Sequence, residues 1–267
     1  MARIIAISNQ KGGVGKTTTS INLGGALALA GHRVLLVDLD PQGNASSGVG
    51  WPRTEVEDGV YDLLLEGASV DDVARMTDVP GLELIPVTDA LVGAEVELVG
   101  EMGRERRLHS ALDAVRDRYD WILIDCPPSL GLLTINAFVA ADSVLIPLQA
   151  EYFAMEGLSG LMNTVAQVQK WLNPALVREG VLLTLQDRRT NLGREVEAQT
   201  REAFGEGSDG GVFMTTIPRN VRLAEAPSHG LPAVVWAKHC PGTRAYIELA
   251  DELLARHGLR ARRVEAS

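Results

Sequence analysis

Cysteine, lysine and aromatic residues are all scarce in this sequence of 267 residues. It has two cysteines, Cys126 and Cys240, four lysines beside 21 arginines, and an aromatic fraction of 4%. Two cysteines are too few for a disulfide framework. The sequence also lacks an N-terminal secretory pattern and any apolar run near the roughly 18 residues of a membrane-spanning helix. We therefore expect a protein of the reducing cytoplasm.

Positive charge is in short supply as well, and the charge is unevenly distributed. The chain has 25 Lys and Arg against 35 Asp and Glu, a net charge of −10, which taken alone argues against a DNA-binding protein. Residues 55–105 hold 14 acidic and two basic residues, so the rest of the chain is close to neutral, at +2. The acidic segment is either an ordinary solvated face or a face turned away from DNA or toward a basic partner peptide.

The hydrophobic pattern predicts the fold class. Runs that are apolar at consecutive positions are typical of strands buried on both faces. Six such runs are Ile4–Ile7, Val34–Val37, Leu82–Pro86, Trp121–Ile124, Val144–Ile146 and Val181–Leu183. Helical patterns cover Thr18–Ala30, Glu156–Leu172, Asn191–Phe204 and Thr243–His257. The alternation predicts an α/β fold with a mostly parallel, doubly wound sheet flanked by helices.

No internal repeat or low-complexity linker divides the chain. We expect a single domain over residues 1–267, with a short Arg-rich tail from about residue 258 to residue 267.

A glycine-rich loop connects the first expected strand to the first expected helix. It reads Ser8-Asn9-Gln10-Lys11-Gly12-Gly13-Val14-Gly15-Lys16-Thr17-Thr18. Main-chain N–H groups of such a loop and the positive end of the helix bind phosphate oxygens. Lys16 would reach the β- and γ-phosphates, and the Thr17 hydroxyl would ligate Mg²⁺. Gln10 stands where the general P-loop has glycine, and a second lysine, Lys11, enters the loop.

The segment Lys-Gly-Gly-Val-Gly-Lys-Thr resembles the deviant Walker A motif of the ParA/MinD family of P-loop ATPases. Residues 37–44 resemble the ParA switch I segment, residues 124–131 resemble its Walker B and switch II, and residues 217–227 resemble a stretch of chromosomal ParA proteins. The resemblance extends to about Leu254 and implies the P-loop NTPase fold and Mg²⁺-dependent ATP hydrolysis.

The implied ATP-binding residues come from the P-loop and from one later loop. They are Lys11, Gly12, Gly13, Val14, Gly15, Lys16, Thr17, Thr18, Pro218 and Asn220. The stretch Pro218-Arg219-Asn220 resembles the family's base-contacting loop, and Asn220 could offer both a donor and an acceptor to adenine. A plain turn built on Pro and Asn is the alternative.

Three aspartates are candidates for the chemistry. Asp125 follows a buried strand, so its carboxylate would lie at the carboxyl edge of the sheet and hold Mg²⁺ directly or through water. Asp38 and Asp40 are two apart and would point the same way from an extended segment, toward the metal and the attacking water. The resemblance gives the water-positioning role to Asp40; the expected metal set is Thr17, Asp38, Asp40 and Asp125. Helix capping or solvation is the alternative for each aspartate.

By the same resemblance, Lys11, Lys16 and Asp40 form the catalytic set. Lys11 crosses a two-fold interface to the nucleotide of the partner subunit, which implies an ATP-dependent sandwich homodimer. Without the γ-phosphates, the positive charges of the two Lys11 side chains would be less well compensated and would repel each other. The dimer would therefore form with ATP and be weakened after hydrolysis.

ParA proteins without an N-terminal helix-turn-helix domain bind DNA non-specifically through surface arginines. The first expected strand begins at Arg3, so we expect no such domain here. Candidate phosphate contacts are Arg188, Arg189, Arg219 and Arg222, with surface salt bridges as the alternative. The resemblance implies partitioning of a chromosome or plasmid, association with the nucleoid, and a ParB-type partner that stimulates hydrolysis.

Three other functions remain to be weighed. A MinD-like membrane ATPase would need a C-terminal amphipathic helix, but the nine residues after Gly258 include two large apolar ones and cannot anchor stably. A reductase of the nitrogenase iron-protein type would bridge a cluster with two cysteines per subunit, whereas Cys126 and Cys240 look like ordinary free thiols. A nucleotide-gated scaffold without turnover stays open.

Overall fold

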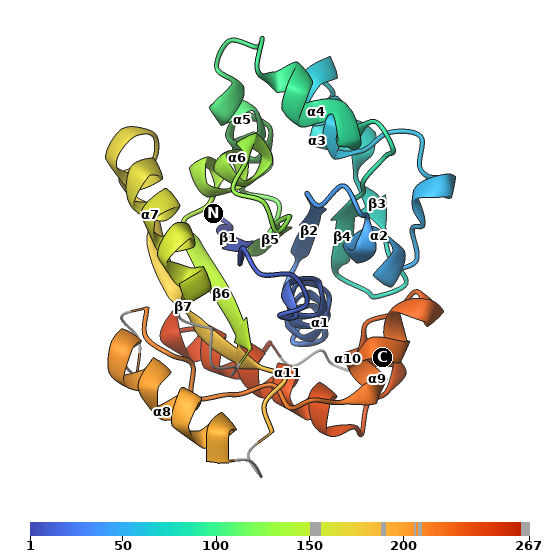
Figure 1. Cartoon of the computed structure of the whole chain (residues 1–267). Helices are drawn as coiled ribbons and strands as arrows, with labels where there is room; N and C mark the ends of the chain where they lie inside the picture. The colour runs from blue at the N-terminus through green and yellow to red at the C-terminus, as the bar shows by residue number, and fades with distance from the viewer. Residues whose placement is uncertain (150–155, 188–190, 206, 208–209, 263–267) are drawn as a thin grey trace.

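One seven-stranded sheet forms the centre of the molecule (Figure 1). The structure, a computed structural model, describes residues 1–149, 156–187, 191–205, 207 and 210–262. The strands are β1 (Arg3–Ile7), β2 (Val34–Asp38), β3 (Arg75–Met76), β4 (Leu82–Ile85), β5 (Trp121–Asp125), β6 (Ser143–Gln149) and β7 (Val177–Thr184). Their order is β3-β4-β2-β5-β1-β6-β7, and every pair is parallel except β3 with β4. All six expected strands are confirmed; the two-residue edge strand β3 was not expected, because it has no apolar run.

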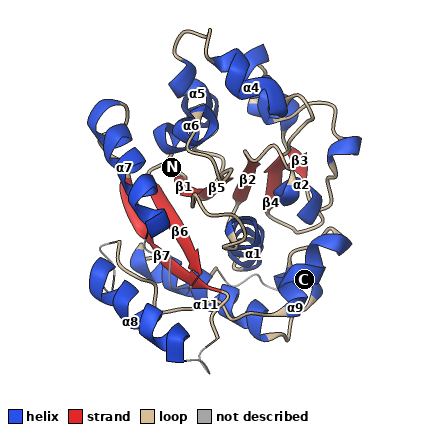
Figure 2. Cartoon of the chain, in the orientation of Figure 1, coloured by secondary structure: helices blue, strands red, loops and turns tan. Residues whose placement is uncertain are grey.

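Helices cover both faces of the sheet (Figure 2). They are α1 (Lys16–Leu29), α2 (Asn44–Gly48), α3 (Val70–Val73), α4 (Leu91–Leu98), α5 (Arg107–Asp113), α6 (Leu132–Ala140), α7 (Glu156–Trp171), α8 (Asn191–Phe204), α9 (Val221–Glu225), α10 (Ala233–Trp236) and α11 (Pro241–Arg256). The four expected helices correspond to α1, α7, α8 and α11. After α1 the chain turns at Gly31, whose φ of +85° suits glycine at a helix end.

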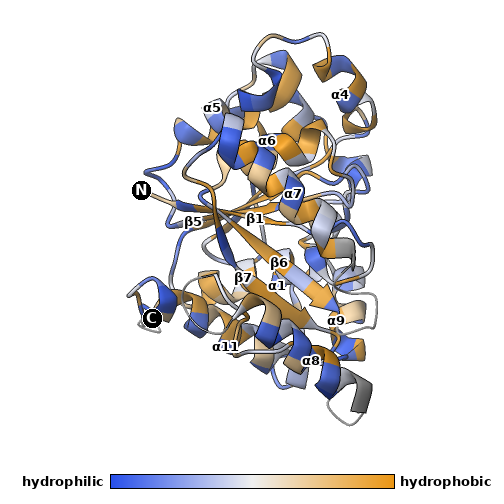
Figure 3. Cartoon of the chain, turned by 60° about the vertical axis from the view of Figure 1, so that its left-hand side comes forward, coloured by the Kyte–Doolittle hydropathy of each residue, from blue (hydrophilic) through white to orange (hydrophobic). Residues whose placement is uncertain are grey.

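Two hydrophobic cores lie on opposite faces of the sheet. Alternate residues of β1 enter alternate cores, with Ile4 and Ala6 in one and Ile5 and Ile7 in the other. Helices α4, α5, α6 and α7 supply side chains to the first core, and α1, α10 and α11 supply them to the second. Figure 3 shows the strands as a largely hydrophobic layer between these helices. The expected α/β architecture is confirmed, and the parallel strands bring their carboxyl ends to one edge.

None of the helices in the described ranges is long and apolar enough to cross a membrane.

Candidate nucleotide site

The P-loop joins β1 to α1 and borders an open cavity. Gly13 and Gly15 have φ values of +74° and +87°, which only glycine adopts without strain. Val14 between them is buried, and its carbonyl accepts a hydrogen bond of 2.7 Å from the Thr184 hydroxyl of β7. The loop is therefore fixed to the sheet while its glycines face the cavity.

This phosphate cavity has a volume of about 310 Å³. Its lining residues are Gly12, Gly13, Gly15, Lys16, Thr17, Thr18, Asp40, Asn44, Pro128 and Leu185. The structure thus brings the expected P-loop residues together with one expected aspartate from the segment after β2.

Lys16 is the buried cation of the site. Its side chain is only 7% exposed, and Nζ donates a hydrogen bond of 3.3 Å to the main-chain carbonyl of Lys11. Burial lowers the pKa of the Lys16 ammonium, and the carboxylates of Asp125 and Asp40 act against that shift. The ammonium is held in place before any ligand binds, while the side chain of Lys11 is exposed.

Asp125 and Asp38 end the adjacent strands β5 and β2 and lie opposite each other in the sheet register. Both are fully buried, and burial raises the pKa of each carboxyl above its usual range; the neighbouring Asp38 adds to the shift at Asp125. The Ser20 hydroxyl donates a hydrogen bond of 2.8 Å to Oδ1 of Asp125, but Oδ2 of Asp125 has no hydrogen-bond partner among the described residues. A buried carboxylate oxygen without a donor is an acceptor that a cation would satisfy.

Asp38 has a different environment from Asp125. Its Oδ2 accepts hydrogen bonds of 2.7 Å from both the N–H and the hydroxyl of Ser46, and Oδ1 accepts one of 3.3 Å from the N–H of Asp40. A metal bound directly to Asp38 would compete with these donors. Asp40 itself is 8% exposed, and its Oδ1 accepts a hydrogen bond of 3.0 Å from the N–H of Gln42.

The described residues include no group of three or more His, Cys, Asp or Glu side chains placed to hold a metal ion. A cation at Asp125 would therefore need further oxygen ligands, such as the Thr17 hydroxyl, phosphate oxygens and water. Mg²⁺ is commonly bound in that way, by one or two carboxylates together with substrate phosphates. The donors present fit Mg²⁺ bound with a nucleotide.

A smaller cavity of about 90 Å³ lies beside the phosphate cavity, with Gly15, Thr18 and Leu185 in the walls of both. Asn220 contributes to its lining, as do apolar side chains of α9 and the buried Tyr246 of α11. The Asn220 side chain also accepts a hydrogen bond of 3.0 Å from the N–H of Arg222, so it caps α9. The expected base contact and the expected local turn role are compatible at this residue.

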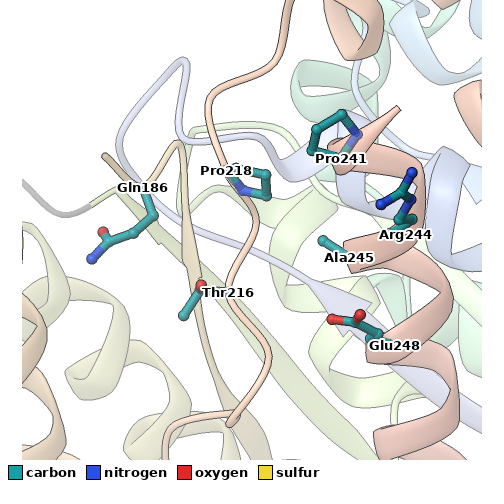
Figure 4. A pocket seen from close by; sticks show the side chains of 7 residues that line it. All are labelled: Gln186, Thr216, Pro218, Pro241, Arg244, Ala245 and Glu248. Atoms are coloured by element: carbon teal, nitrogen blue, oxygen red, sulfur yellow. The ribbon is translucent and has the colours of Figure 1, made fainter. Parts of the chain in front are cut away.

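Pro218 lies elsewhere, on a third hollow of about 370 Å³ (Figure 4). In this view Thr216 and Pro218 face Arg244 and Glu248 of α11 across the hollow. The structure therefore places Asn220, but not Pro218, at the cavity beside the P-loop.

Sequence reasoning missed several residues of the site. Ser20 and Ser46 bond to the two buried aspartates, and Leu185 lines both nucleotide cavities. Leu185 has a φ of +52°, the one positive φ at a non-glycine residue in the part of the chain that the structure describes. That conformation costs a branched side chain about 1–2 kcal/mol and often marks functional positions. No sequence signal distinguishes this leucine.

The candidate DNA contacts are only partly visible. Arg219 and Arg222 are exposed at the start of α9. Arg222 forms an ion pair of 2.8 Å with Glu225 and lies over the Trp236 ring, 5.6 Å from its centroid. Arg188 and Arg189 lie outside the described residues.

The two cysteines have separate structural roles. Cys126 is fully buried after β5, and Cys240 precedes α11 and accepts a hydrogen bond from the N–H of Thr243. A buried thiol does not reach the surface, where a cluster shared between subunits would be bound.

Comparison with known proteins gives close relatives. Residues 2–178 match a family described as AAA domain. The sporulation initiation inhibitor protein Soj of Bacillus subtilis is 57% identical over 255 residues, which cover 96% of this chain and 99% of that protein. The chromosome partitioning protein ParA of Caulobacter vibrioides is 50% identical over 256 residues, covering 95% of this chain and 94% of that protein.

Solved structures agree on the fold. A Mycobacterium smegmatis protein named cobyrinic acid a,c-diamide synthase, with bound ADP and magnesium, is 36% identical with a TM-score of 0.84, covering 99% of this chain and 100% of that one. The septum site-determining protein MinD of Pyrococcus horikoshii, complexed with Mg-ADP, is 27% identical with a TM-score of 0.75, covering 95% and 96%.

Proposed function

Since the chain belongs to the ParA/MinD family of P-loop ATPases and is a partitioning ATPase that hydrolyses ATP with Mg²⁺, we propose that it moves DNA through an ATP-dependent dimer. In this proposal the ATP-bound sandwich dimer coats DNA without sequence preference. A ParB-type partner stimulates hydrolysis and releases the protein from the DNA.

The observation that carries the proposal is the grouping of Lys16, Thr17 and Asp40 around one cavity, next to the buried Asp125. Phosphoryl transfer to water needs neutralised γ-phosphate oxygens and a positioned in-line water. Lys16 supplies the positive charge, and Asp40, at the cavity wall, orients the water. When bound, Mg²⁺ would be held by Thr17 and Asp125 and would neutralise negative charge on the phosphates.

Asp38 is proposed to act on the metal through water, because its oxygens already accept hydrogen bonds from Ser46 and Asp40. Asn220 is proposed to contact the adenine base from the smaller cavity. Pro218 would shape the loop that presents Asn220. We propose that residues 1–267 act as one ATPase domain.

Lys11 is proposed to complete the site of a second subunit. Its side chain is exposed, although the main chain of the same residue contacts Lys16 within the loop. An exposed lysine on a loop fixed to the sheet is placed to reach across a two-fold axis.

DNA phosphates are proposed to contact Arg188, Arg189, Arg219 and Arg222, and dimerisation doubles the number of contacts. ATP-dependent DNA binding of this kind would place the protein on the nucleoid. Non-specific binding of this type is carried by phosphate charge and weakens steeply with salt.

The test is retardation of an arbitrary duplex DNA by the protein with ATP, with ADP and without nucleotide. We expect binding with ATP only, and a large loss in the variant Arg189→Ala/Arg222→Ala. Arg118→Ala is the matched control, since Arg118 is paired with Asp71 in the acidic segment. Full DNA binding by the double variant would show that these arginines do not form the DNA-binding surface. In a separate experiment, ATP-dependent co-sedimentation of the protein with liposomes would favour the MinD-like alternative.

A further inference from the structure

Helix α4 carries apolar residues on two faces, and only one of them is covered. Its inner residues are Leu91, Ala94 and Leu98, all fully buried in the first core. On the outer face Val92, Val96 and Val99 are 68%, 79% and 59% exposed. Their spacing of four and three residues places them in one stripe along the helix. A helix that is apolar on both sides is typical of one covered on both sides.

The stripe continues past the end of α4. The N–H groups of Val99, Gly100 and Glu101 donate hydrogen bonds of 3.3, 3.2 and 3.0 Å to carbonyls three residues earlier. These bonds extend the turn up to Met102, which is 92% exposed. We call the residues Val92, Val96, Val99 and Met102 the α4 stripe.

Acidic residues border the α4 stripe. Residues 91–103 contain Glu95, Glu97 and Glu101 and no lysine or arginine. Glu101 pairs with Arg107, and Arg104 donates a hydrogen bond to the carbonyl of Val99, so cations lie beside the C-terminal end of the stripe. Glu95 and Glu97 form no ion pair with any residue that the structure describes, although Glu97 accepts a hydrogen bond of 2.7 Å from the Tyr61 hydroxyl. The part of the stripe formed by Val92 and Val96 is therefore a hydrophobic surface with a negatively charged rim.

We propose that the α4 stripe is the docking surface for a basic amphipathic helical segment of a partner protein. An apolar face on that segment would cover the valines, and lysines or arginines beside it would face the glutamates. Two copies of the stripe would bring like charges together, and an anionic membrane would be repelled by the same rim. The charge thus selects a basic polypeptide as the occupant.

The α4 stripe is mechanically linked to the nucleotide site. Glu95 Oε1 accepts a hydrogen bond of 3.4 Å from the N–H of Leu133, in the first turn of α6. It also sits directly against Gly131, where an added Cβ would lie 2.0 Å from the same oxygen. Gly131 belongs to the segment that follows Asp125, and Pro128 of that segment lines the phosphate cavity. Docking on α4 would therefore change the ATP turnover rate, independently of DNA binding.

The test measures binding of a fluorescein-labelled helical peptide of about 18 Leu and Lys residues, long enough to form a helix, with all Leu on one face. The first comparison peptide has the same composition, but its Leu residues are spread around the helix. The second keeps the Leu face and has Glu in place of Lys. The protein variant Val92→Ser/Val96→Ser/Val99→Ser removes the three valines of the α4 stripe; we call it the stripe variant. The control variant Val177→Ser/Met214→Ser removes two apolar side chains that are 56% and 61% exposed elsewhere.

We expect the amphipathic Lys peptide to bind the wild type at least about tenfold more tightly than either comparison peptide, a difference of about 1.4 kcal/mol. The affinity of the stripe variant for this peptide should fall by at least the same factor, whereas that of the control variant should not. Saturating peptide should change the ATP turnover rate of the wild type by more than about twofold. Equal binding of the scattered peptide, or unchanged binding by the stripe variant, would overturn the proposal. The proposal would also be overturned if the wild type and the control variant dimerised without nucleotide and the stripe variant did not. A second copy of the protein would then cover the α4 stripe. Unchanged turnover at saturation would overturn the link through Glu95.

Discussion

Replacing Glu225 with Gln should strengthen DNA binding, because it releases Arg222 from an ion pair. The two side chains are 58% and 43% exposed and lie 2.8 Å apart. Exposed pairs of this kind contribute about 0.2–1 kcal/mol. Arg222 must break this ion pair, and lose its free energy, before it can contact a DNA phosphate. A dimer contains two such pairs, so Glu225→Gln should increase the affinity for DNA by about 2- to 30-fold. Gln keeps the size of Glu, so we expect the contact of Arg222 with Trp236 to be kept.

Fluorescence anisotropy with a labelled duplex of arbitrary sequence, in the presence of ATP and over a range of salt concentrations, measures the effect. The gain should shrink as salt rises, because salt screens the exposed pair in the free protein. Asp78→Asn is the control, with the same charge change at an exposed position in the acidic segment. Binding by Glu225→Gln that equals or falls below the wild type would refute a phosphate contact by Arg222.

Three further predictions address the dimer, the chemistry and the stability. Lys11→Ala should abolish ATP-dependent dimers in analytical ultracentrifugation, and an unchanged dimer fraction would count against a contact in trans. Asp40→Ala should still dimerise but lose at least about 100-fold in ATP turnover, as for loss of a positioned catalytic group; undiminished activity would exclude the water-positioning role. Burial, aided by the charge of Arg262 and opposed by that of Asp120, lowers the pKa of His32 below 6.5. Just below pH 6.5, the His32 imidazole is therefore protonated in the unfolded chain but not in the folded one. The free energy of unfolding falls as the pH drops through that range. His32→Leu should therefore flatten the fall in melting temperature between about pH 7 and pH 5, and an unchanged slope would show that His32 does not cause it.

The sequence predicted the buried strands and the long helices well, and the short helices and edge strand between β2 and β5 poorly. Strands buried on both faces are apolar at every position, so β1, β2, β4 and β5 stand out. Helices α2 to α5 are short, between four and eight residues, and their ends carry little hydrophobic periodicity. Strand β3 makes two residue pairs with β4, and the Trp51 indole N–H donates a hydrogen bond of 2.9 Å to the Met76 carbonyl; neither contact leaves a local sequence pattern.

The site was predictable where one contiguous segment forms it. The P-loop residues are consecutive, and Asp125 follows from its position at a strand end. Ser20 was not predictable as a partner of Asp125, because the two are 105 positions apart in the sequence and meet only when α1 packs beside β5. Leu185 was missed for a similar reason, since its backbone conformation is set by tertiary structure.

The α4 stripe and Arg222 of α9 lie on opposite faces of the sheet. The inner residues of α4 belong to the first core, whereas Leu223 of α9 belongs to the second, and Figure 1 shows the two helices at opposite ends of the molecule. The sheet lies between them, and exposed charges separated by more than a Debye length of about 8 Å are largely screened in physiological salt. The glutamates beside the stripe are thus screened from Arg222, and the net charge of −10 does not by itself exclude DNA binding there. It follows that a basic segment on the α4 stripe and DNA on the arginines would occupy separate faces and would not compete, so saturating peptide should leave the DNA affinity of the ATP-bound dimer unchanged over the time before hydrolysis.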